Sequence, residues 1–550
     1  MYILGITSPI AWNSAAALVK DGMLVASVEE ERFNRVKHAP RMAPMQAIAY
    51  CLRTAGITLD RVDYVAVGGR DAAAMGALVF IQGLLERRFK NAFMTLGGAF
   101  EQFIFEYRVQ HLLARELTSA AGLRWVFLPH HECHAASAYY CSGFSKANLL
   151  TLDGSGEDDA GYLGLGDGPR MRRFEKVPPC NSLGAFFEQV TDLLGFRPHS
   201  EEGKTMGLAA WGQPADDLHD VFVFTDTNFA IRRDSVQRLW KAYGPRRQPG
   251  QDLTDHNRVL AASAQQALER AGTTLARRLY RRTRETHWCM AGGVALNCDM
   301  NAKILAEPFV EHLYVQPAAH DGGTALGAAL ALHARLGGKS SFVMEHAYWG
   351  PEYSNDEIEA VLKEAKVPYE RCQEIEPEVA TRLARGEIVG WFQGRMEIGP
   401  RALGNRSILA HPAMAEMKDK VNRDIKHREM WRPFAPSILE EEAVNYFERA
   451  RPSPFMLLTF KVIPSKVSDL AAAVHVDQTA RVQTVSRKTN PRFYRVIARF
   501  GQLTGVPAVL NTSFNDRGEP LVGSPRDALR TFYGTGLDAL AIGDFLLTKR

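Results

Sequence analysis

The sequence lacks several features that would place it in a specialised class. Its seven cysteines form no C-x-x-C pair, and an odd set argues against both a zinc ribbon and a secreted disulfide scaffold. No apolar run approaches the ~18–20 residues that cross a bilayer, and the first residues lack the basic and apolar regions of a signal peptide. We therefore expect a soluble protein of the cytoplasm, a reducing compartment, with no membrane partner.

A large excess of charge of one sign is also missing. The formal net charge of +4 is too small for a chain of this size to indicate a nucleic-acid-binding surface. The basic stretch from Arg277 to Arg284 keeps apolar residues at helical spacing, which favours the solvated face of a helix. Neither a Walker A loop nor a G-x-S-x-G nucleophile elbow occurs. We expect no nucleic-acid partner.

The pattern of apolar runs predicts an α/β fold. A strand at 2–6 and the Asp21-Gly22 pair between runs at 15–19 and 23–28 predict a strand followed by a hairpin. Further buried strands are expected at 64–67, 125–128, 147–152, 288–291 and 313–315. Glycine, aspartate or histidine clusters, or helical patterns, follow these strands, so functional loops should lie at the strand ends.

At 550 residues the chain exceeds the size at which one hydrophobic core stops growing, so at least two domains are expected. The glycine- and serine-containing stretch 335–341 and the turn-rich stretch 350–355 place a boundary near residue 350. A second α/β pattern follows, with helices at 356–365 and 377–385 and a strand at 388–392. The predicted domains are residues 1–350 and 351–550.

A first candidate site combines histidines and aspartates. His130 and His134 are four residues apart and share one face of a helix, while Asp153 and Asp321 each follow a predicted strand and precede glycines. Two histidines and two aspartates suit Fe²⁺ or Zn²⁺. The alternatives are capping or core histidines and plain tight turns. Bare backbone amides that could approach phosphate oxygens lie at Gly154, Gly292, Gly293, Gly322 and Gly323.

A second candidate site is rich in arginine. Residues 394–407 and 422–433 mix arginine and lysine with glycine and proline, which forbids a long regular element and predicts loops that bind phosphates. Asn511 and Ser513 follow a strand predicted at 507–510, and Arg481 adds a further cation. The alternative interpretation is a set of surface ion pairs.

Several strings, in one order along nearly the whole chain, resemble the carbamoyltransferases of nodulation factors and antibiotic tailoring. They are EEERF at 29–33 with Lys37-His38, HxxxH before AASAYY, Asp153-Gly154, EGKTMGLA at 202–209, and the segments 292–297, 321–327, 396–407, 432–436 and 510–515. The resemblance implies an N-terminal actin-like ATPase domain similar to threonylcarbamoyl transferases, followed by a YrdC-like α/β domain.

The resemblance also implies a reaction. Carbamoyl phosphate and ATP with Mg²⁺ would form a carbamoyl adenylate in the YrdC-like domain, and the carbamoyl group would then pass to a hydroxyl of a small molecule. The implied catalytic residues are Lys37, Arg401, Lys426 and Arg432, the implied metal ligands are His130, His134, Asp153 and Asp321, and the implied cofactor-binding residues are Gly154, Lys204, Gly292, Gly293, Asn297, Gly322, Gly323, Arg481, Asn511 and Ser513. A homodimer is the default oligomer.

One position departs from the family pattern. Many relatives place His-Asp before the alanine-rich strand, where this chain has Trp12-Asn13. Because asparagine cannot act as a general base, the base for the acceptor is left unassigned. Two other functions stay open: a carbamoylating enzyme with a tRNA or protein acceptor, and a non-catalytic nucleotide-binding sensor.

Overall fold

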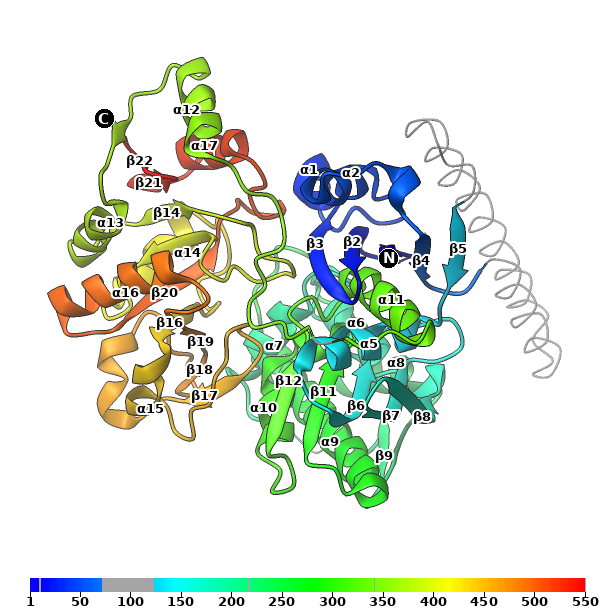
Figure 1. Cartoon of the computed structure of the whole chain (residues 1–550). Coiled ribbons are helices and arrows are strands. Elements are labelled where there is room, and N and C mark those ends of the chain that lie inside the picture. Colours follow the sequence, from blue (N-terminus) through cyan, green and yellow to red (C-terminus); the bar gives the residue numbers. More distant parts are fainter. Residues whose placement is uncertain (9–10, 72–122, 216–217, 341, 550) are drawn as a thin grey trace.

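The computed structural model describes residues 1–8, 11–71, 123–215, 218–340 and 342–549, and it has the predicted α/β fold (Figure 1). The first sheet has the strand order β3-β2-β1-β4-β5. Its strands are β1 (Tyr2–Thr7), β2 (Ala15–Lys20), β3 (Met23–Glu29), β4 (Tyr64–Gly68) and β5 (Arg124–Phe127). Asp21 and Gly22 both have positive φ, +49° and +82°, which matches the twist of a tight hairpin and confirms that prediction.

The second sheet repeats the topology of the first. Its order is β12-β11-β6-β7-β8, and in both sheets three antiparallel strands are followed by two parallel ones. The strands are β6 (Lys146–Leu152), β7 (Gly161–Asp167), β8 (Arg170–Val177), β11 (His287–Ala291) and β12 (His312–Val315). All the strands predicted before residue 320 are therefore present.

Two helices lie between the sheets and in contact with each other. Helix α11 (Gly322–Arg335) packs on β1, β2 and β4, whereas α5 (His130–Ser142) packs on β6, β7 and β11. A Cβ atom at Gly327 would lie only 1.8 Å from the carbonyl oxygen of Cys133, so glycine is required where the two helices meet. This close packing fixes the first turns of both helices relative to each other.

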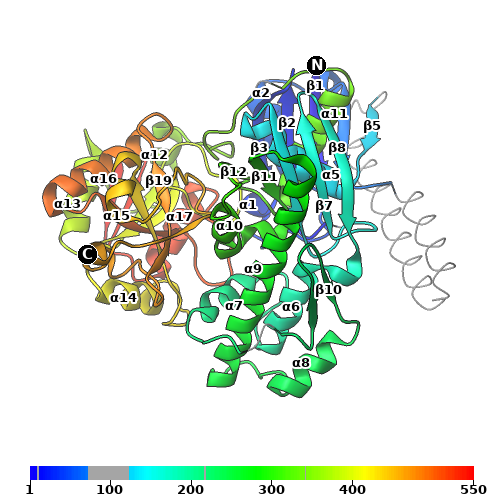
Figure 2. The same ribbon diagram turned by 90° about the horizontal axis from the view of Figure 1, so that it is seen from below.

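Some of the remaining elements of the N-terminal part pack on these sheets, and others extend beyond them (Figure 2). They are α1 (Glu31–Asn34), α2 (Met45–Ala55), η1 (Leu59–Arg61), η2 (Pro179–Asn181), α6 (Leu183–Leu193), α7 (Glu202–Ala209), β9 (Phe222–Phe224), β10 (Phe229–Ile231), α8 (Ser235–Tyr243), α9 (Asp255–Thr283), η3 (Gly293–Leu296) and α10 (Cys298–Leu305). A capping box of Thr254 and Asn257 begins α9. The basic stretch from Arg277 belongs to α9, where Leu279 is buried, as predicted.

The C-terminal part is built on one mixed sheet of order β13-β22-β21-β14-β15-β20-β16-β19, with a separate β17-β18 pair. Its elements are α12 (Asn355–Glu364), β13 (Glu370–Arg371), α13 (Ile375–Ala384), β14 (Val389–Phe392), β15 (Arg406–Ala410), α14 (Glu416–Asp424), β16 (Ala435–Leu439), η4 (Glu440–Glu442), α15 (Ala443–Tyr446), β17 (Thr459–Lys461), η5 (Pro464–Lys466), η6 (Ser468–Leu470), β18 (Thr479–Arg481), β19 (Gln483–Val485), α16 (Pro491–Thr504), β20 (Ala508–Ser513), α17 (Pro525–Gly534), β21 (Ala539–Ile542) and β22 (Phe545–Thr548). Both helices and the strand predicted between 356 and 392 are present. Strand β20 runs on to Ser513, so Asn511 and Ser513 lie in its last residues rather than beyond it.

The two parts share a buried contact. Gly399 donates its N–H to Glu29 Oε1 (2.6 Å) and accepts from Arg32 Nη2 through its carbonyl oxygen (2.8 Å). Arg32 also pairs with Glu29 (3.3 Å), and both side chains are almost fully buried. Ile398, Leu403 and Met456 from the C-terminal part belong to the apolar core of the N-terminal part. The domain boundary near residue 350 stays a prediction.

Within the described residues, no helix is both long and apolar enough to cross a membrane.

We predict that Arg32→Met lowers the stability of the protein by about 3–5 kcal/mol, because it leaves the buried carboxylate of Glu29 without its cation. Thermal denaturation followed by circular dichroism measures the change. Lys363→Met removes a solvent-exposed ion pair with Glu359 and is the control, with no measurable shift expected. An Arg32→Met protein that melts with the wild type would contradict the importance of this contact.

Candidate functional site

A cavity of about 1080 Å³ lies between the two parts of the chain and contains both predicted sites. His130, Asp153 and Asp321 line it from the N-terminal part. Arg401, Lys426, Arg428, Arg432 and Arg481 line it from the C-terminal part. The histidine–aspartate cluster and the arginine-rich pocket are therefore two ends of one continuous space.

Four ligand atoms converge at the first end. His130 and His134 project from the first turn of α5, Asp153 follows β6, and Asp321 precedes α11. Their ligand atoms all lie within 4.8 Å of one another. The Nε2 atoms of the two histidines are 3.1 Å apart, and His134 Nε2 lies 2.9 Å from Asp153 Oδ2. The packing of α5 against α11 brings residues 191 positions apart to one point.

Each aspartate is oriented by its other oxygen. Asp153 Oδ1 accepts from the N–H of Gly154 (2.7 Å), and Asp321 Oδ2 accepts from the N–H of Trp12 (2.9 Å). The buried Oδ2 of Asp153 has only the two imidazoles beside it, with His134 Nε2 at 2.9 Å and His130 Nε2 at 3.7 Å. A buried carboxylate oxygen that converges with two imidazole nitrogens is an arrangement that suits a divalent cation. The donor set of two nitrogens and two oxygens fits Fe²⁺ or Zn²⁺.

The opposite end is strongly cationic. Burial, and next the neighbouring Arg481, lower the pKa of Arg401 to about 9. Burial, and next Arg428, lower the pKa of Lys426 well below its ordinary value. The Nε–H groups of Arg401 and Arg481 are buried and have no hydrogen-bond partner. Several desolvated like charges with free donors form a site for a polyanion, because a bound anion would offset their repulsion.

Asn511 and Ser513, near the end of β20, form hydrogen bonds with other residues of the C-terminal part. Lys426 Nζ donates to the carbonyl oxygens of Ser513 (2.9 Å) and Asn515 (2.8 Å) and to Ser513 Oγ (3.2 Å). Asn511 donates to Ser437 Oγ and Gln483 Oε1, while its own Oδ1 is buried without a partner. Ser513 thus orients Lys426, and Asn511 retains a free acceptor.

Comparison with known proteins identifies the family. The model of the carbamoyltransferase N-terminus matches residues 2–330, and that of the carbamoyltransferase C-terminus matches residues 380–549. The chain belongs to the carbamoyltransferase family. Nodulation protein NolNO of Sinorhizobium fredii is 40% identical over 98% of this chain and 79% of its own length. The 3'-hydroxymethylcephem-O-carbamoyltransferase of Amycolatopsis lactamdurans is 31% identical over 70% of this chain and 74% of its own length.

These relatives support the assignment of this carbamoyltransferase as an O-carbamoyltransferase, an enzyme. Among solved structures, full-length HypF in its phosphate- and nucleotide-bound form is similar to 62% of this chain and spans 56% of its own chain, with 12% identity and a TM-score of 0.37. That likeness is too distant to carry an argument about function.

The structure sorts the other predicted residues of this carbamoyltransferase into two groups. Three predicted glycines, Gly292, Gly322 and Gly323, do not line the cavity. The residues that do line it are Lys37, Gly154, Lys204, Gly293, Asn297, Arg481, Asn511 and Ser513. Lys204 pairs with Glu201 (2.6 Å) and, across the two parts, with Glu429 (2.8 Å). Asn297 accepts from Met300 N at the start of α10 and is paired with Gln265, so its side chain has structural partners.

Not every arginine of the segment 394–407 serves the cavity. Arg406 is fully buried away from it, and its guanidinium donates to the carbonyl oxygens of Gln393, Asn405, Pro351 and Gly394. Arg395 donates to the carbonyl oxygen of Trp349 and so joins the two parts. Arg395, Arg401 and Arg406 come from the same segment, and only their packing in the folded chain gives them different partners.

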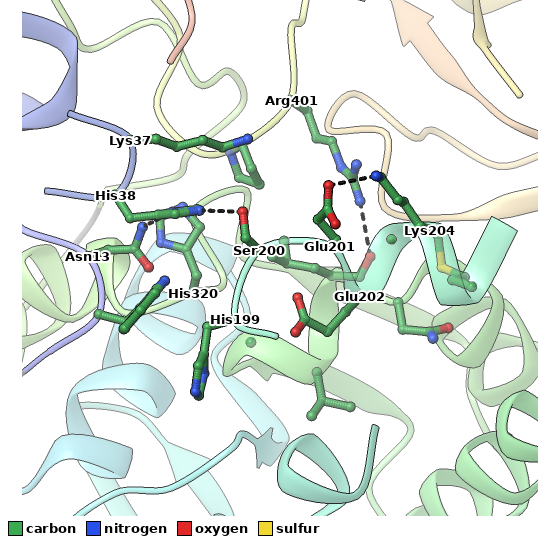
Figure 3. A pocket seen from close by; sticks show the side chains of 18 of the residues that line it. Asn13, Lys37, His38, His199, Ser200, Glu201, Glu202, Lys204, His320 and Arg401 are labelled. Atoms are coloured by element: carbon green, nitrogen blue, oxygen red, sulfur yellow. Dashed lines mark hydrogen bonds and ion pairs between the residues drawn. The ribbon is translucent and has the colours of Figure 1, made fainter. Parts of the chain in front are cut away.

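The cavity wall also carries residues that sequence reasoning did not assign (Figure 3). They are His38, His199, Ser200, Glu202 and His320. Burial lowers the pKa of His38 to about 4 and also lowers the pKa of Lys37. Burial and Glu202 raise the pKa of Glu188 to about 8. Only His38 and Glu202 had a sequence signal, because they belong to the Lys37-His38 and EGKTMGLA strings of the resemblance.

We predict that His134→Ala weakens binding of Fe²⁺ or Zn²⁺ by more than ~100-fold, because one of four converging ligands is lost and three remain. Isothermal titration calorimetry on the purified chain, anaerobic for Fe²⁺, measures the affinity. His199→Ala is the control, since His199 lines the same cavity but lies outside the cluster. Equal affinities for the His134→Ala and His199→Ala proteins would show that the cluster does not hold the ion.

Proposed function

We propose that this carbamoyltransferase activates carbamoyl phosphate with ATP and Mg²⁺ at the cationic end of the cavity and transfers the carbamoyl group to a small-molecule hydroxyl at the histidine–aspartate end. The observation that carries the proposal is the single cavity that joins the two ends. In this proposal the N-terminal part is an actin-like domain, the C-terminal part is YrdC-like, and they divide near residue 350.

The cationic end suits the activation step. Carbamoyl phosphate and water would give carbamate and phosphate, and carbamate and ATP would then give carbamoyl adenylate and pyrophosphate. Arg401, Arg432 and Arg481 would bind the phosphates, since guanidinium groups match phosphate oxygens in bidentate fashion. Lys426, held by Ser513 and Asn515, would add a fixed positive charge. Positioned cations of this kind stabilise the charge that develops during phosphate chemistry.

The other end suits the transfer step. His130, His134, Asp153 and Asp321 would hold a divalent ion, which supplies Lewis-acid stabilisation of negative charge. Carbamate itself is a poor electrophile, and joining it to AMP provides a good leaving group. Lys37 lines the cavity nearby and would stabilise the departing phosphate. Transfer within one cavity would shorten the exposure of the adenylate to water.

The acceptor is proposed to be a hydroxyl of a small natural product or sugar. One relative is named for a 3'-hydroxymethylcephem acceptor, and others are nodulation proteins. A tRNA acceptor calls for a broad basic surface, which the net charge of +4 does not favour. A sensor would have no use for two chemically distinct ends joined in one cavity.

We predict that Arg401→Met and Lys426→Met each lower carbamoyl-phosphate-dependent pyrophosphate release by about 100-fold or more, because each removes a buried cation from the phosphate site. Arg526→Met, which replaces an exposed partner of Glu364 outside the cavity, is the control and should keep the wild-type rate. A coupled pyrophosphate assay with ATP, Mg²⁺ and carbamoyl phosphate gives the rates. Normal release from either cavity variant would refute the proposed activation site.

The two ends should also separate kinetically. We predict that His134→Ala retains pyrophosphate release within ~10-fold while AMP release, which requires carbamoyl transfer, falls by at least ~100-fold. The reason is that the histidine–aspartate end acts after adenylation. Quench-flow measurement of both products from one reaction gives the two rates. Parallel loss of pyrophosphate and AMP would place the cluster in the activation step instead.

A further inference from the structure

The imidazole of His38 lines the cavity and lies between two polar partners (Figure 3). Its Nδ1 is 2.9 Å from the side-chain Nδ2 of Asn13, and its Nε2 is 3.4 Å from Ser200 Oγ. Asn13 is buried, and Ser200 lines the cavity. One ring nitrogen therefore faces the protein, while the other faces the cavity through a long contact with a hydroxyl.

The backbone around this pair is fixed on both sides. Trp12 N donates to Asp321 Oδ2 (2.9 Å), and Ser14 N donates to the carbonyl oxygen of His38 (3.1 Å). The N–H of His38 donates to the carboxylate of Glu31. His38 has φ +67°, which a residue with a Cβ adopts only when its surroundings impose it. The orientation of the ring is thus built into the fold.

The partner of Nδ1 decides which nitrogen of His38 carries the proton. An amide NH₂ group can only donate, so Nδ1 accepts and the proton of the neutral ring sits on Nε2. We propose that Asn13 holds His38 as a neutral hydrogen-bond donor whose Nε2–H points into the cavity and binds the carbonyl oxygen of the carbamoyl group during transfer. Ser200 would occupy that donor at rest, and its 3.4 Å contact is long enough to be replaced.

This role rests on the proposed function and assigns a task to a residue that the activation step does not use. During transfer the acceptor hydroxyl oxygen would bond to the carbamoyl carbon, and the bond from that carbon to the AMP phosphate oxygen would break with its electrons going to the phosphate. The hydroxyl proton would pass to a phosphate oxygen. A neutral donor at the carbonyl oxygen stabilises the negative charge that develops there. In this tautomer His38 cannot be the general base, because its acceptor nitrogen faces Asn13.

Nitrogen NMR tests the tautomer without any substrate. The full-length protein is labelled with ¹⁵N-histidine, and the His38 signals are those missing from the His38→Gln protein. We expect an unprotonated Nδ1 and a protonated Nε2 at pH 7.5. The opposite tautomer, or a doubly protonated ring, would overturn the proposal.

Variants at position 38 test the role of the proton. Glutamine can place an N–H near Nε2 but cannot act as a base, whereas leucine can do neither. The assay contains ATP and carbamoyl phosphate, with water as the acceptor, and measures the rate of AMP formation relative to that of pyrophosphate. We expect this ratio to fall by no more than ~10-fold for His38→Gln and by at least ~100-fold for His38→Leu. Equal losses in the two variants would refute a donor role.

Asn13→Asp supplies the complementary test. A carboxylate can only accept, so Nδ1 would take the proton and Nε2 would become an acceptor. We expect the NMR tautomer to reverse and the ratio of AMP to pyrophosphate to fall as in His38→Leu. A reversed tautomer with an unchanged ratio would overturn the role in transfer. If the wild type formed neither product from carbamoyl phosphate, the proposed function would fail, while NMR would still decide the tautomer.

Discussion

Gly399 gives both of its backbone polar groups to the opposite part of the chain, and the cavity depends on that contact. Its N–H binds Glu29 and its carbonyl oxygen binds Arg32, and these two side chains form a buried ion pair. Arg401 follows two residues later and faces the cavity. A buried pair contributes little net stability but penalises any arrangement that separates its members. It therefore fixes the loop that carries Arg401 against the end of β3 in the first sheet.

The two ends of the cavity have opposite electrostatic requirements. The cationic end collects desolvated arginines and a lysine that lower one another's pKa, and it favours bound polyanions. The other end places two carboxylates beside two imidazoles and favours a cation. Lys204 pairs with both Glu201 and Glu429, and the second of these pairs joins the two parts of the chain.

Local chemistry explains which features the sequence could predict. The Asp21-Gly22 hairpin, the i, i+4 histidines and the strand runs depend on neighbouring residues, and all are present. Whether an arginine reaches the cavity depends on residues far away in the sequence that pack around it. Arg401 and Arg406 come from one segment, yet the guanidinium of Arg406 donates to backbone carbonyl oxygens in the core. The same limit applies to Gly322 and Gly323, which the sequence pattern could not distinguish from Gly154 at the cavity wall. The partners of His38 come from two separate segments, so no motif spacing reveals them.

The dipeptide Trp12-Asn13 contacts both the histidine–aspartate cluster and His38. The N–H of Trp12 donates to Asp321, and the side chain of Asn13 contacts His38, so one short loop orients a member of the cluster and the cavity imidazole. An aspartate at position 13 would accept a proton from His38 Nδ1 and make Nε2 an acceptor, and it would add a carboxylate next to the residue whose N–H holds Asp321. Asparagine avoids both effects, because its amide donates to His38 Nδ1 and carries no charge. The loss of an acidic group at this position is therefore consistent with a site that stabilises charge by hydrogen bonding rather than by proton removal.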